Sequence, residues 1–156
     1  MICLPAFAGC MTTQPETWEV DVSGLDFIQF TYIRDRDANT SPSRRVTRLE
    51  LLGNGHLSLE VGSASRVEDA FWTRREVPNW HDLRRDNIVL TKAQTTHYFQ
   101  SLVDAGFFGK DFKKQQADDE SRDLLVYSHV GKRRQACATA DPDLVRMFRE
   151  LLKRFQ

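Results

Sequence analysis

The sequence has few cysteines, no excess of charge of either sign and no long apolar run. Two of its three cysteines fall within the first ten residues, a distribution that makes neither a disulfide framework nor a paired Cys-x-x-Cys zinc site. The 22 lysines and arginines balance the 22 aspartates and glutamates, so no long-range field attracts nucleic acid or an anionic surface. No apolar run is long enough to span a bilayer as a helix.

Recognisable catalytic and cofactor motifs are also missing. The histidines at 56, 81, 97 and 129 show neither His-x-x-x-His nor His-Glu-x-x-His spacing. The acidic run at 118–120 lacks the alternating ligands and the glycine of a calcium loop. There is no glycine-rich phosphate cradle and no Gly-x-Ser-x-Gly. We therefore expect no metal, no cofactor and no enzymatic activity.

The clearest local signal is an amphipathic helix within residues 90–108. Thr91 and Gln94 have the spacing of a capping box, so the helix should begin near Lys92. Gly106 supplies the left-handed residue of a Schellman motif, so the helix should end at residue 105 or 106. An isolated helix of this length is marginal in water, and its apolar stripe must therefore be buried. That stripe consists of Phe99, Leu102, Val103 and Gly106.

A second helix is predicted to begin after Asp141. The carboxylate of Asp141 suits the N-cap, and Pro142 suits the first helical position, where its missing N–H costs nothing. Apolar residues then recur with helical spacing. They are Leu144, Phe148, Leu151, Leu152 and Phe155.

Two hairpins are predicted from turn residues and alternation. A three-residue loop at 53–55, with its last glycine left-handed, pairs Leu51 with Leu57 and gives one clean apolar face. A two-residue II′ turn at 131–132 places Cys137 opposite Val126. In this register Cys137 does not share a cross-strand pair with the nearest histidine.

The remaining chain contains one clear strand and one weak region. Residues 25–34 are partly apolar on both faces, which is typical of an inner strand. Residues 62–87 follow no period, apart from a short strand suggested around Val67 and Phe71. The resulting order predicts an α+β domain: an antiparallel sheet of about five strands with two helices packed on one face.

The weak region contains the candidate binding residues. Tryptophan and arginine are the residues that most often anchor interfaces, and long irregular connections are often functional. The alternative is that the tryptophans form a small satellite core and the arginines are solvated. The candidates are Trp72, Arg74, Arg75, Trp80 and His81.

The N-terminus carries a short motif. Small residues precede Cys10 in Phe7-Ala8-Gly9-Cys10, and polar, turn-prone residues follow it. This stretch resembles the lipobox of bacterial lipoproteins, with Phe7 standing where the motif prefers an aliphatic residue. The resemblance implies lipidation of Cys10. It divides the chain into a signal remnant (1–10), a flexible tether (11–23) and one α+β domain (24–156).

These observations predict a non-catalytic lipoprotein domain, anchored by its lipid in a bacterial membrane and facing the periplasm. Its expected partner is a protein or another envelope component, with no nucleic acid and no small-molecule cofactor. One alternative is a cytosolic protein- or nucleic-acid-interaction module whose N-terminus is ordinary chain. The other is an unrecognised hydrolase that uses Cys137 or His81.

Overall fold

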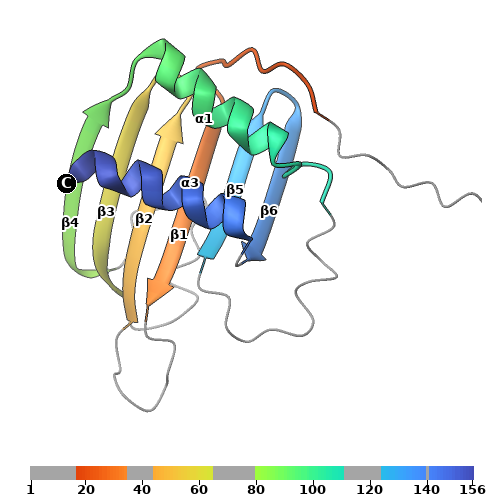
Figure 1. Cartoon of the computed structure of the whole chain (residues 1–156). Helices are drawn as coiled ribbons and strands as arrows, with labels where there is room; N and C mark the ends of the chain where they lie inside the picture. The colour runs from red at the N-terminus through yellow and green to blue at the C-terminus, as the bar shows by residue number, and fades with distance from the viewer. Residues whose placement is uncertain (1–16, 35–43, 65–79, 111–123, 140) are drawn as a thin grey trace, which may run out of the picture.

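The computed structural model describes residues 17–34, 44–64, 80–110, 124–139 and 141–156. One antiparallel sheet has the strand order β4-β3-β2-β1-β5-β6, and both helices lie across the same face of it (Figure 1). The α+β architecture is therefore confirmed, and the described residues form six strands instead of about five. The elements are β1 (Phe27–Arg34), β2 (Arg44–Leu52), β3 (His56–Ala64), β4 (His81–Val89), α1 (Lys92–Asp104), β5 (Leu124–Val130), β6 (Arg133–Thr139), α3 (Pro142–Leu152) and the 3₁₀ turn η2 (Lys153–Phe155).

Helix α1 begins and ends where the sequence predicts. The Thr91 hydroxyl accepts from the backbone N–H of Gln94 at 3.2 Å, and the Gln94 side chain accepts from the backbone N–H of Thr91 at 3.0 Å. At the other end Gly106 has a φ of 72°, and the N–H of Phe107 donates to the carbonyl of Leu102 at 3.3 Å, as in a Schellman motif. Its buried side chains are Thr95, Tyr98, Phe99, Leu102 and Val103.

Helix α3 is also capped as predicted. The Asp141 carboxylate accepts from the backbone N–H groups of Asp143 at 3.0 Å and Leu144 at 3.3 Å, and Pro142 opens the helix. The helix runs antiparallel to α1 across the sheet (Figure 1). Its buried side chains are Leu144, Met147, Phe148 and Leu151.

Both hairpins have the predicted register. In β2–β3, Leu51 lies opposite Leu57, and Gly55 at the end of the loop has a φ of 90°. In β5–β6, Cys137 lies opposite Val126, and the glycine that opens the turn has a φ of 61°. Turn chemistry and alternation therefore determine these registers together, because a slip of one residue would move each apolar set to the other face.

Strand β4 corrects the sequence analysis, which treats most of residues 62–87 as an aperiodic connection. The strand pairs with β3 at the edge of the sheet, with a register shift near its start, where Asp82 has a φ of 52°. Most of its side chains are exposed, so backbone pairing holds it and no alternation marks it. The short strand suggested at Val67 and Phe71 lies outside the described residues.

The main core fills the space between the helices and the sheet. Strand β1 pairs with both β2 and β5, which confirms it as an inner strand. Phe30 of β1 contacts Phe148 of α3, with ring centroids 6.0 Å apart. Phe99 of α1 and Leu49 of β2 are fully buried in the same cluster. The side chains on this face of the sheet therefore pack with those of α1 and α3 in one continuous core.

The opposite face of the sheet has a smaller buried cluster and an ion-pair set. Glu60 of β3 lies between Arg48 of β2 and Arg85 of β4, and the Nε of Arg85 is 2.9 Å from the Glu60 carboxylate. This set joins three neighbouring strands through charge. The cluster beside it consists of Ile33, Val46, Ala64 and Trp80.

Residues 17–23 pack on the domain, although the sequence analysis assigns them to the tether. Val20 is buried in the main core, and Trp18 is packed against it. The side chain of Gln100 on α1 accepts from the N–H of Val20 and donates to the carbonyl of Trp18, both at 2.9 Å. This stretch is therefore part of the domain. The earlier residues of the predicted tether lie outside the described part of the chain.

Candidate functional site

The structure describes two of the predicted binding residues, Trp80 and His81. Trp80 is 7 % exposed, and the guanidinium of Arg48 lies 5.5 Å from its ring centroid. Trp80 thus belongs to the small cluster on the sheet face opposite the helices. His81 is exposed at the start of β4. The other three lie outside the described residues: Trp72, Arg74 and Arg75.

The two residues of the hydrolase alternative lie at opposite edges of the sheet. His81 is on β4, and Cys137 is on β6. Five strand spacings separate these strands, or roughly 24 Å at about 4.8 Å per spacing. Cys137 is also buried, which suits a small core residue. The two residues therefore do not form a nucleophile and base pair with each other.

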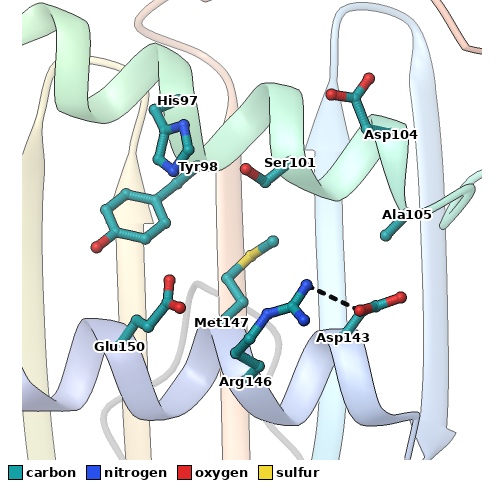
Figure 2. A pocket seen from close by; sticks show the side chains of 9 residues that line it. All are labelled: His97, Tyr98, Ser101, Asp104, Ala105, Asp143, Arg146, Met147 and Glu150. Atoms are coloured by element: carbon teal, nitrogen blue, oxygen red, sulfur yellow. Dashed lines mark hydrogen bonds and ion pairs between the residues drawn. The ribbon is translucent and has the colours of Figure 1, made fainter.

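A groove between α1 and α3 is a concave feature of the described residues. Its volume is about 400 Å³, within the range of roughly 300–1,000 Å³ that is typical of ligand pockets. Figure 2 shows side chains from both helices directed into the space between them. We call this feature the inter-helix groove. It is lined by His97, Tyr98, Ser101, Asp104 and Ala105 of α1 and by Asp143, Arg146, Met147 and Glu150 of α3.

The charged groups of the inter-helix groove are unevenly paired. Arg146 donates to the carboxylate of Asp143 at 2.8 Å (Figure 2). Asp104 accepts from the side-chain amide of Gln100, also at 2.8 Å. The carboxylate of Glu150 has no hydrogen bond or ion pair with any described residue. Three carboxylates against one guanidinium leave the groove with a formal charge of −2 when His97 is neutral.

Tyr98 provides the polar group at the inner wall of the groove. The residue is 4 % exposed, and its ring contacts that of His97 at a centroid distance of 5.6 Å. In Figure 2 the ring extends from α1 toward α3, and the carboxylate of Glu150 rises from α3 toward it. Within the described part of the chain the hydroxyl of Tyr98 has no hydrogen-bond partner. The hydroxyl is accessible from the groove, so it is available to a ligand.

The groove does not have the geometry of nucleophilic catalysis. Ser101 and His97 lie one turn apart on α1, and no hydrogen bond joins them in the structure. Asp104 is bound by Gln100 and orients neither of them. A triad needs the nucleophile, base and orienting group to converge, and these three side chains of the groove do not. Among the described residues no group of three or more His, Cys, Asp or Glu side chains is placed to hold a metal ion.

Asp141 fixes the helix that forms the lower wall of the groove. Burial alone would raise its pKa, but the hydrogen bonds from Lys110 at 2.8 Å and from the backbone N–H groups of Leu144 and Asp143 outweigh burial and hold the pKa below its ordinary value. The cap is therefore charged at neutral pH. It anchors the first turn of α3, from which Asp143 and Arg146 project.

The inter-helix groove is not predicted from the sequence. A signal exists for each wall: His97, Ser101 and Asp104 recur at helical spacing beside the buried stripe of α1, and Asp143 and Glu150 do so on α3. From the sequence, each set is indistinguishable from the polar, solvent-exposed face of an ordinary amphipathic helix. Only the tertiary arrangement shows that the two faces line one groove. No protein-family model matches the chain, and no curated protein matches it.

Proposed function

We propose that this chain is a membrane-tethered lipoprotein domain that binds a protein or envelope component and catalyses no reaction. The tether is the lipid on Cys10, and the binding surface is the inter-helix groove. The observation that carries the proposal is the pair of groups that face this groove without a partner among the described residues, the hydroxyl of the largely buried Tyr98 and the exposed carboxylate of Glu150. Both groups can exchange hydrogen bonds with water for hydrogen bonds with a bound partner.

The arrangement of the domain is compatible with tethering through Cys10. The first described residues, from Thr17, already lie on the domain, and Trp18 packs beside α1. A lipid on Cys10 would thus be separated from the packed domain by only a few residues. No helix in the described part of the chain is long and apolar enough to cross a bilayer. A lipid on Cys10 is the attachment that the lipobox-like sequence supports.

Membrane fractionation and intact mass of the natively expressed protein test the tether. We expect a mature species that begins at Cys10, is heavier by a diacylglycerol-sized adduct and is found in the membrane fraction. The Cys10→Ser variant should lose both the adduct and the membrane association. A soluble, unmodified chain that retains Met1 would contradict the proposal and would favour the cytosolic interaction module.

Site-specific photo-cross-linking in cells tests the binding surface. A photoreactive amino acid replaces His97, which is exposed beside the groove, and in a matched variant it replaces Asp86, which is exposed on β4 at the sheet edge. We expect a cross-linked envelope protein from the variant at position 97 and not from that at position 86. The same products from both positions would show that the groove is not the binding surface.

A further inference from the structure

We infer that the inter-helix groove binds a cationic side chain, an arginine or lysine presented by a protein partner. This inference rests on the proposed binding function and names the chemistry of its ligand. Three features of the groove support it. These are its negative charge, the unpartnered groups at one end and the apolar surface between them.

The negative charge of the groove favours a ligand with a positive charge. Its one guanidinium, Arg146, is already bound to Asp143 at 2.8 Å, so this pair offers little attraction to an anion. The carboxylate of Glu150 is unpaired, and Asp104 has only the neutral amide of Gln100 as its partner. A positive group that enters the groove near Tyr98 therefore meets the unpaired carboxylate of Glu150, while Asp104 adds negative charge at the other end (Figure 2). An anionic ligand would meet repulsion from both.

Tyr98 points to a ligand independently of this charge. The residue as a whole is 4 % exposed, and its hydroxyl, which is the accessible part of the side chain, has no hydrogen-bond partner among the described residues. A guanidinium or ammonium group carries several N–H donors, so it can donate to the Tyr98 oxygen and to the Glu150 carboxylate at the same time. The side chains of these two residues extend toward each other from opposite helices (Figure 2). A single cationic group between them would satisfy both.

The surface between the charged groups suits the stem of such a side chain. Met147 is buried on α3 and lines the groove, together with the ring of Tyr98 and the methyl group of Ala105. Arginine and lysine stems pack along apolar surface while their charged ends reach polar groups. Methionine adapts to the shape of such a stem. This combination favours a side chain of a protein over an inorganic cation, because a hydrated ion would gain nothing from the apolar wall.

NMR titration of the full 156-residue chain carrying Cys10→Ser tests the inference. The probe is the peptide acetyl-Gly-Arg-Gly-amide, and the control is the same peptide with citrulline, which has the shape of arginine without its charge. We expect the arginine peptide to shift the amide signals of residues 97–105 and 143–150, with an affinity that falls as salt is added. The citrulline peptide should bind at least about fivefold more weakly, because it lacks the charge-assisted hydrogen bonds.

Two conservative variants and one matched control assign the effect to the groove. Glu150→Gln should weaken binding of the arginine peptide about fivefold, and Tyr98→Phe about threefold, because each removes one group that faces the cation. Glu19→Gln, an exposed position outside the groove, should leave the affinity unchanged. The variants alter single polar atoms, and their unperturbed spectra before titration will show that the fold is intact.

The outcomes separate this inference from the proposed function. Equal binding of the arginine and citrulline peptides, or no shift in either helix at millimolar arginine peptide, would overturn the inference. If the photo-cross-link at position 97 nevertheless captures an envelope protein, binding at the groove stands and only the cationic chemistry is wrong. If the arginine peptide binds but the protein is soluble and unmodified, the inference stands and the membrane tether is wrong.

Discussion

The two faces of the sheet are buried by different means. Among the described residues, twenty buried ones form one continuous cluster under α1 and α3, whereas four form the cluster on the opposite face. Strand β1 contributes to both, with Phe30 toward the helices and Ile33 away from them. On that second face, polar residues of β1 such as Gln29 and Thr31 are also buried. The helix-covered face therefore relies on apolar area, and the opposite face combines a small apolar cluster with polar and charged contacts.

This difference predicts where substitutions cost most. Phe99→Ala should lower the free energy of unfolding by roughly 3–5 kcal/mol, because it opens a cavity in the larger cluster. Chemical denaturation measures the change, and Val89→Ala, at a residue that is 68 % exposed, is the control and should change little. A loss below about 1 kcal/mol for Phe99→Ala would mean that the helix-covered face is not the main source of stability.

The smaller cluster can be tested in the same way. Trp80→Ala should cost about 3 kcal/mol, at the lower end of the range for large aromatic residues, because few neighbours surround the ring and Arg48 lies over it. The denaturation midpoint of this variant is compared with that of Phe99→Ala. A cost equal to or above that of Phe99→Ala would show that the opposite face contributes as much as the helix-covered one.

The same contrast explains how far the sequence predicts the fold. Elements of the helix-covered face carry signals that agree with one another: the capping box at Thr91, the left-handed glycines of both hairpins, and the cap at Asp141. Strand β4 lacks such a signal. It is an edge strand with mostly exposed, charged side chains, so its pairing with β3 depends on backbone hydrogen bonds that no alternation records.

The candidate site is less predictable than the fold, for a related reason. Tryptophan and arginine near residue 80 are typical of an interface, yet Trp80 is buried beneath Arg48. The residue types alone do not show whether a tryptophan is exposed for a binding partner or buried inside the domain. The inter-helix groove, by contrast, depends on the distance and direction between two helices far apart in the sequence. The sequence of either helix alone, with His97 on α1 or Glu150 on α3, does not show how the two helices lie relative to each other.

Two hairpin glycines differ in how much space surrounds them, and replacing each with alanine tests the packing between the β2–β3 turn and the start of α1. At Gly55, where φ is 90°, an added Cβ would lie 2.6 Å from the carbonyl oxygen of Leu90, just before α1. Gly131 has a similar backbone conformation with no atom within 4 Å of an added Cβ. Gly55→Ala should therefore cost more than 2 kcal/mol, and Gly131→Ala about 1 kcal/mol, the conformational penalty alone. Equal losses in thermal unfolding would show that the contact at Leu90 relaxes freely.

An effect as small as that of Gly131→Ala is expected at the N-cap of α3, and this one depends on pH. Asp141→Ala should cost about 1 kcal/mol at neutral pH. Because the pKa of Asp141 is lower in the folded state, the charged cap stabilises the fold above the unfolded pKa of about 3.9, and this contribution is lost as pH falls through the lower folded pKa. Unfolding of both proteins between neutral pH and pH 3 measures the difference. Asp141→Asn keeps an oxygen acceptor for the cap, so it should retain most of the stability without this pH dependence. A gap that widens on acidification would contradict the assignment, because it would mean that protonated Asp141 caps α3 better than the carboxylate does.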